Sequence, residues 1–184
     1  MQKHPFEWLS IKTQTRAFIV LLILTLVVMW VLQVLDGHLK TEAAPAGIVS
    51  FEFAENVTNA KHILASWEPQ GTIYAGMSLG LDFLFLFSYA GAIGLGCVLA
   101  ARGLSQRSIT IFLLGAPLAW GQLCAALLDA VENISLIQVL LGVESALWPA
   151  LAFWCAIPKF IIVAMGLLYL AVSGVLLMIK KPQV

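Results

Sequence analysis

One apolar stretch of the sequence, LLDAVENISLIQVLLG, carries two carboxylates and an amide. Asp129, Glu132 and Asn133 are spaced i, i+3 and i+4, so a helix places all three on one face. Two further ionisable residues, Asp82 and Lys159, also stand in apolar sequence. Such groups could bind a small ligand or cation, transfer protons to a substrate, or fix how helices pack.

The composition indicates that these residues lie in a membrane protein. The chain has 184 residues, of which 61% are hydrophobic and 11% charged, with a mean hydropathy of +0.95. A small soluble domain cannot bury that much apolar surface. The formal net charge is zero, which argues against nucleic acid as a partner. The three cysteines form no CxxC pair and are interpreted as buried apolar residues, and we expect no metal site and no cofactor.

Hydropathy predicts an all-α, four-helix membrane bundle forming a single domain, 1–184. The predicted spans are 17–35, 74–101, 109–130 and 160–179. With four spans, most cations fall on one side, which the positive-inside rule assigns to the cytoplasm together with both termini. These cations are Lys3, Lys12, Arg16, Arg102, Arg107, Lys180 and Lys181.

Two segments between the spans are predicted to lie on the outer side. Segment 36–73 contains a short lid helix that Asn56 or Thr58 caps and that runs to about Trp67, a residue interpreted as an anchor for the lid. Segment 134–158 is predicted to be an interfacial helix before the last span. A fifth span over 134–157 is the rejected alternative, because it would bury Glu144 at a cost of about 2.5–3.5 kcal/mol.

Depth along the spans predicts that the polar residues meet near the outer surface. Asp82 lies roughly 12 Å below the start of its span at 1.5 Å per residue. The third span delivers Asp129, Glu132 and Asn133 to a similar depth, and Lys159 begins the fourth. Three small-residue motifs in the second span predict that this span is the central helix: Gly76-xxx-Gly80, Ala90-xxx-Gly94 and Ala92-xxx-Gly96.

Charge and spacing add weaker candidates to this cluster. Tyr89 and Gln122 extend the polar stripes of the second and third spans. Glu52 and His62 lie in the outer segment and could act as an acid or a ligand, although a solvated loop position is the favoured interpretation of Glu52. Three carboxylates with one lysine predict that at least one carboxyl is protonated or holds a cation.

The sequence also resembles a known group of proteins. LDFLFLFSYA (81–90) and LLDAVENISLI (127–137), preceded by GIVSFEFAENV, are similar to stretches of an uncharacterised group of bacterial four-helix inner-membrane proteins. The resemblance implies a multi-pass protein of the bacterial inner membrane and groups the polar residues together. It implies no reaction.

Three functions are compatible with the cluster. It could fix the helices structurally, with Lys159 pairing with Asp82 or Glu132. It could bind or organise a small ligand, a lipid headgroup, a partner protein or a second copy of the chain, and this function is the one we prefer. The alternative is a metal- or carboxylate-dependent enzyme acting on a lipid, although no nucleophile or metal-ligand motif appears. We therefore lean toward a protein that is not an enzyme.

Overall fold

The computed structural model describes residues 3–179, which form five helices and no strand. Their bounds are α1 Ile11–Asp36, α2 Ile48–Glu52, α3 Val57–Leu104, α4 Ile109–Leu140 and α5 Leu147–Met178. All except α2 are long and apolar enough to cross a membrane. The predicted all-α bundle with four apolar helices is therefore confirmed. Lys180 and Lys181 lie outside the described residues.

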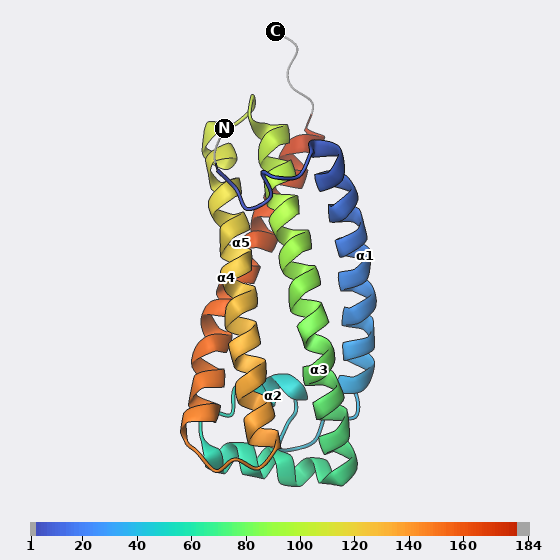
Figure 1. Cartoon of the computed structure of the whole chain (residues 1–184), viewed down its shortest axis with the longest axis vertical. Coiled ribbons are helices and arrows are strands. Elements are labelled where there is room, and N and C mark those ends of the chain that lie inside the picture. The colour runs from blue at the N-terminus through green and yellow to red at the C-terminus, as the bar shows by residue number, and fades with distance from the viewer. Residues whose placement is uncertain (1–2, 180–184) are drawn as a thin grey trace.

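The long helices run side by side, and their connections bring the start of α1 and the end of α5 to one end of the bundle (Figure 1). Side chains define where three of these helices begin. Ser10, Asn56 and Ser108 each accept a hydrogen bond from the backbone N–H three residues later. Such caps satisfy N–H groups that the first turn of a helix leaves unpaired.

The lid predicted from the sequence is the first part of α3. The helix starts at Val57, breaks at Glu68, where φ is 55° and ψ is 179°, and continues beyond Pro69. Figure 1 shows this first part lying across the lower end of the bundle, beneath α2. Trp67 is 4% exposed and its indole donates a hydrogen bond to the Leu39 carbonyl (2.7 Å). This contact anchors the lid, as expected.

The segment 134–158 differs from the prediction of a separate helix. Its first residues complete α4, which continues to Leu140, and its last residues begin α5 at Leu147. A short loop that contains Gly142 (φ 80°) joins the two helices. Pro158 lies inside α5. The charged Glu144 remains exposed in the turn, so the helices could lengthen without burying it.

Helix α3 is the central helix of the bundle and packs against α1, α4 and α5. Two of the predicted small-residue motifs explain the close packing: Gly94 lies against the Ala119 carbonyl of α4, and Gly96 against Phe18 and Leu170. The motif at Gly76 and Gly80 is packed less closely, since a Cβ at Gly76 would lie 3.5 Å from a methyl group of Leu140 and one at Gly80 would have no neighbour within 4 Å.

Candidate functional site

The centre of the site is Lys159, which is buried in α5 and faces two carboxylates of α4. Its Nζ donates hydrogen bonds to Oδ1 of Asp129 (2.9 Å) and Oε1 of Glu132 (2.8 Å), and lies 2.7 Å from Oε2 of Glu132. The Glu132 side chain is 0% exposed and that of Lys159 only 7%. The i, i+3 spacing of Asp129 and Glu132 therefore places both carboxylates on the face of α4 that contacts Lys159.

Glu52 joins these residues from outside the spans. Its Oε2 lies 3.7 Å from Nζ of Lys159, and its side chain is 12% exposed. The interpretation of Glu52 as a solvated loop carboxylate is therefore wrong. The reason is that α2 folds into the bundle: the N–H of Ile48 donates to Oδ1 of Asp36 (2.7 Å), and Phe51 is 1% exposed.

Burial affects the chemistry of Glu52 directly. Removal from water raises the pKa of this carboxyl above its usual range, because the charged form is poorly solvated. Lys159 opposes this effect, whereas the negative charge of Asp129 adds to it. Glu52 also faces Glu132, so two carboxyl groups from α2 and α4 lie side by side.

Asp82, Asn133 and Tyr89 complete the group. Nδ2 of Asn133 donates to Oδ2 of Asp82 (2.6 Å), and the Tyr89 hydroxyl donates to Oδ2 of Asp129 (2.9 Å). Of the two ion-pair partners expected for Lys159, Asp82 or Glu132, the structure has Glu132, and the other partners of the lysine are Glu52 and Asp129. We call these seven side chains the Lys159 cluster: Glu52, Asp82, Tyr89, Asp129, Glu132, Asn133 and Lys159.

Two of the weaker candidates lie elsewhere. Gln122 is fully buried, but its Nε2 donates to the Ile162 carbonyl of α5 (3.0 Å). It therefore joins α4 to α5 about two helical turns away from Asp129 of the cluster. His62 is an exposed residue of the lid and has none of the described contacts with the cluster. Both are therefore set apart from the site.

A cavity of about 110 Å³ adjoins the cluster between α1, α2 and α3. Three carboxyl groups line it, those of Asp36, Glu52 and Asp82, together with Ser78 and Asn133. Asp36 was not a candidate from the sequence. Its only signal there was its position at the end of the first span, which places it at the same end of the bundle as the cluster.

The chemistry of the site follows from its charges. Four carboxyl groups and one ammonium group share an interior with little water, so the site is suited to holding protons or a positively charged group. Within residues 3–179 no three His, Cys, Asp or Glu side chains are grouped in a way that could hold a metal ion.

The comparisons with known proteins supply no relative. No protein-family model matches the chain, and no curated protein and no solved structure is significantly similar to it. The fold and the cluster together define a class, a multi-pass helical membrane protein with a buried carboxylate and lysine site.

Proposed function

We propose that the Lys159 cluster and its cavity bind a small molecule or lipid headgroup that carries a protonated amine. The observation that carries the proposal is the charge of the site, where three carboxyl groups contact the ammonium group of Lys159 and a fourth, that of Asp82, lines the adjoining cavity. Buried like charges cannot all stay ionised, so protons or a bound cation must compensate them. An ammonium ligand provides the charge and also donates hydrogen bonds to carboxylate oxygens.

Two further features support a ligand rather than a purely structural ion pair. Oε2 of Glu52 is buried, and none of the described residues donates a hydrogen bond to it. Asp82 is not an ion-pair partner of Lys159, and it lines the cavity beside Glu52 and Asp36. The carboxylates with the fewest partners are thus those that a molecule entering the cavity would contact.

The charges also support a proposed membrane orientation. Five cations lie at the end of the bundle where α1 begins and α3 ends: Lys3, Lys12, Arg16, Arg102 and Arg107. By the positive-inside rule this end faces the cytoplasm, so the lid and the cluster lie toward the outer side. We propose the bacterial inner membrane as the location, as the resemblance implies.

The test is binding of dodecylamine to the purified protein in detergent, followed by thermal unfolding and by equilibrium titration. Dodecanol serves as the uncharged control ligand. Asp82→Asn removes one charge while keeping an oxygen that accepts from Asn133. Loss of a charge-assisted hydrogen bond should weaken dodecylamine binding about tenfold or more. Glu144→Gln makes the same charge change at an exposed position and should leave binding unchanged.

Two results would contradict the proposal. One is equal stabilisation by dodecanol and dodecylamine, because the positive charge would then contribute nothing. The other is a stoichiometric metal in the purified protein that is lost in Asp82→Asn. That result would favour the alternative, a metal-dependent enzyme acting on a lipid.

A further inference from the structure

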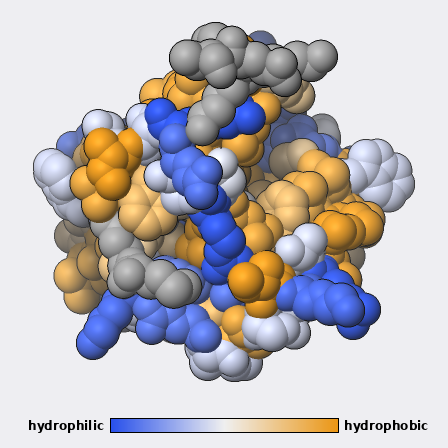
Figure 2. Space-filling view, turned by 90° about the horizontal axis from the view of Figure 1, so that it is seen from above, coloured by the Kyte–Doolittle hydropathy of each residue, from blue (hydrophilic) through white to orange (hydrophobic). Residues whose placement is uncertain are grey.

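A second hollow region lies at the opposite end of the bundle from the lid. Two adjoining cavities, of about 380 and 420 Å³, share His4, Ile11 and Arg102 in their walls. Figure 2 looks onto this end of the molecule, where hydrophilic residues gather among hydrophobic ones. Pockets of this size accommodate small ligands. The region is remote in the fold from the Lys159 cluster, so its role is independent of the function proposed above.

Arg102, near the end of α3, supplies the charge of this region. Its Nη2 donates to Oε1 of Gln14 (3.1 Å). Gln14 in turn donates to the carbonyls of Phe6 and Leu9 (2.9 and 3.0 Å), which fixes the N-terminal segment beside α3. Nη1 of Arg102 is buried and has no hydrogen-bond partner among the described residues. A buried guanidinium nitrogen without an acceptor is costly unless an anion supplies one.

His4 provides a second donor close to this guanidinium. Burial lowers the pKa of His4, Glu7 opposes this effect, and Arg102 adds to it, so the net shift favours the neutral ring. Its Nδ1 accepts a hydrogen bond from the N–H of Phe6 (3.2 Å). The proton of the neutral ring is therefore assigned to Nε2, which is then a donor. The carboxylate of Glu7 accepts from the backbone N–H of His4 and lines the adjoining cavity.

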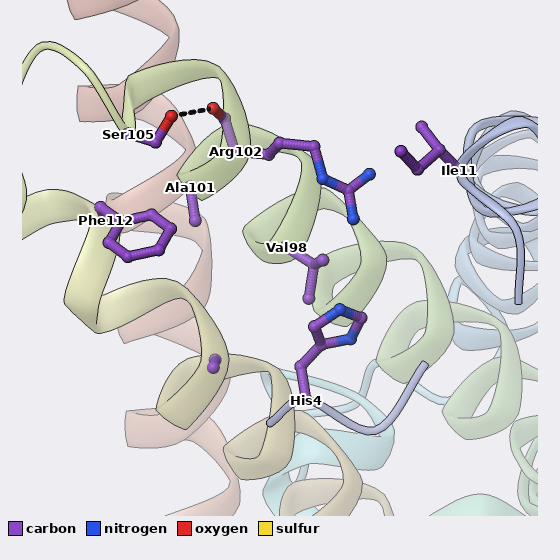
Figure 3. A pocket seen from close by; sticks show the side chains of 8 residues that line it. His4, Ile11, Val98, Ala101, Arg102, Ser105 and Phe112 are labelled. Carbon is purple, nitrogen blue, oxygen red and sulfur yellow. Dashed lines mark hydrogen bonds between the residues drawn. The ribbon is translucent and has the colours of Figure 1, made fainter. Parts of the chain in front are cut away.

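The rest of the larger cavity is apolar. In Figure 3 the Arg102 guanidinium and the His4 ring lie on one side of the pocket, with Phe112 and Ala101 on the other. Val98 and Ala116 also line it. An elongated molecule with a hydrocarbon part and an anionic end matches these walls and these donors.

We propose that this cavity binds an anionic amphiphile, with its acidic headgroup on Arg102 and His4 and its hydrocarbon chain between α3 and α4. Both a phospholipid of the bilayer and a free fatty acid have this chemistry. The exposed cation Lys12 lies on α1 at the same end of the bundle and adds attraction for anions.

The experiment is native mass spectrometry of the purified protein titrated with three probes. These are dioleoylphosphatidylglycerol, oleate, and dioleoylphosphatidylcholine as the zwitterionic control. We expect one or both anionic probes to bind at one site at least tenfold more tightly than the phosphatidylcholine. Tighter binding of the phosphatidylglycerol identifies a bilayer lipid as the source, and tighter binding of oleate identifies a free fatty acid.

Two variants locate the site. Arg102→Gln removes the charge but keeps a donor for Gln14, and it should weaken the anionic probes about tenfold or more. Arg16→Gln removes a charge from the same end without touching the cavity and should have little effect. Ala116→Leu fills the apolar part and should reduce binding while Arg102 is retained, with the melting temperature checking that it is folded. Equal affinities for the three probes, or equal effects of Arg102→Gln and Arg16→Gln, would overturn the proposal.

Discussion

Replacing Lys159 by methionine tests whether the cluster is an ion-paired unit. The substitution keeps an unbranched apolar side chain. Among residues 3–179, it removes the only ammonium group within hydrogen-bonding distance of Asp129 and Glu132. Both carboxylates are buried, so they would be left without the charge that compensates them. Lys159→Met therefore isolates the electrostatic contribution from that of packing.

The magnitude follows from the burial. Removing one partner of a buried ion pair costs about 3–5 kcal/mol, because the remaining charge is neither solvated nor paired. For a chain of this size each kcal/mol lowers the melting temperature by about 2–4 °C. We therefore expect Lys159→Met to melt at least about 6 °C below the wild type at pH 7. Adding Glu132→Gln should recover part of this loss, since one uncompensated carboxylate is removed.

The assay is thermal unfolding in one detergent, followed by circular dichroism. The matched control is Lys61→Met, which breaks the ion pair between Lys61 and Glu144 (2.6 Å), whose side chains are 58% and 73% exposed. Exposed pairs contribute little, so this variant should melt close to the wild type. If Lys159→Met melts as high as Lys61→Met, the carboxylates do not depend on the lysine, and the argument from buried charge fails.

Three further substitutions test other parts of the structure. Burial raises the pKa of Glu52, so the folded state binds the proton of this carboxyl more strongly, and the resulting stabilisation is lost as the pH rises. The melting temperature of Glu52→Gln should therefore fall less between pH 5 and 8 than that of the wild type. Identical pH profiles would refute this. Trp67→Phe removes the hydrogen bond to the Leu39 carbonyl and should increase proteolysis within the lid, whereas an unchanged cleavage rate would show that this bond does not anchor it. A Cβ at Gly166 would lie 2.5 Å from Nε2 of Gln122, so Gly166→Ala should lower the melting temperature, and a stability equal to the wild type would mean that α4 and α5 can separate there.

The sequence determined the features that depend on neighbours along the chain. Apolar length predicted four long helices. Of the two caps expected for the lid, Asn56 or Thr58, the structure has Asn56. The i, i+3, i+4 spacing in α4 predicted the shared face of Asp129, Glu132 and Asn133. These predictions rest on helical periodicity and on local hydrogen bonds. Both act over a few residues, so composition and spacing are sufficient to reveal them.

Only the tertiary structure decided which charges meet. Glu52 reaches Lys159 because α2 folds into the bundle, and Asp36 lines the cavity because it holds the backbone of α2. The unpartnered nitrogen of Arg102 likewise depends on where the N-terminal segment packs. A hydropathy scale assigns the same free-energy cost of burial to a carboxylate at any position. The actual cost depends on the hydrogen-bond and ion-pair partners of the carboxylate, which are far away in the sequence. Those partners are fixed by packing between segments, which no local pattern records.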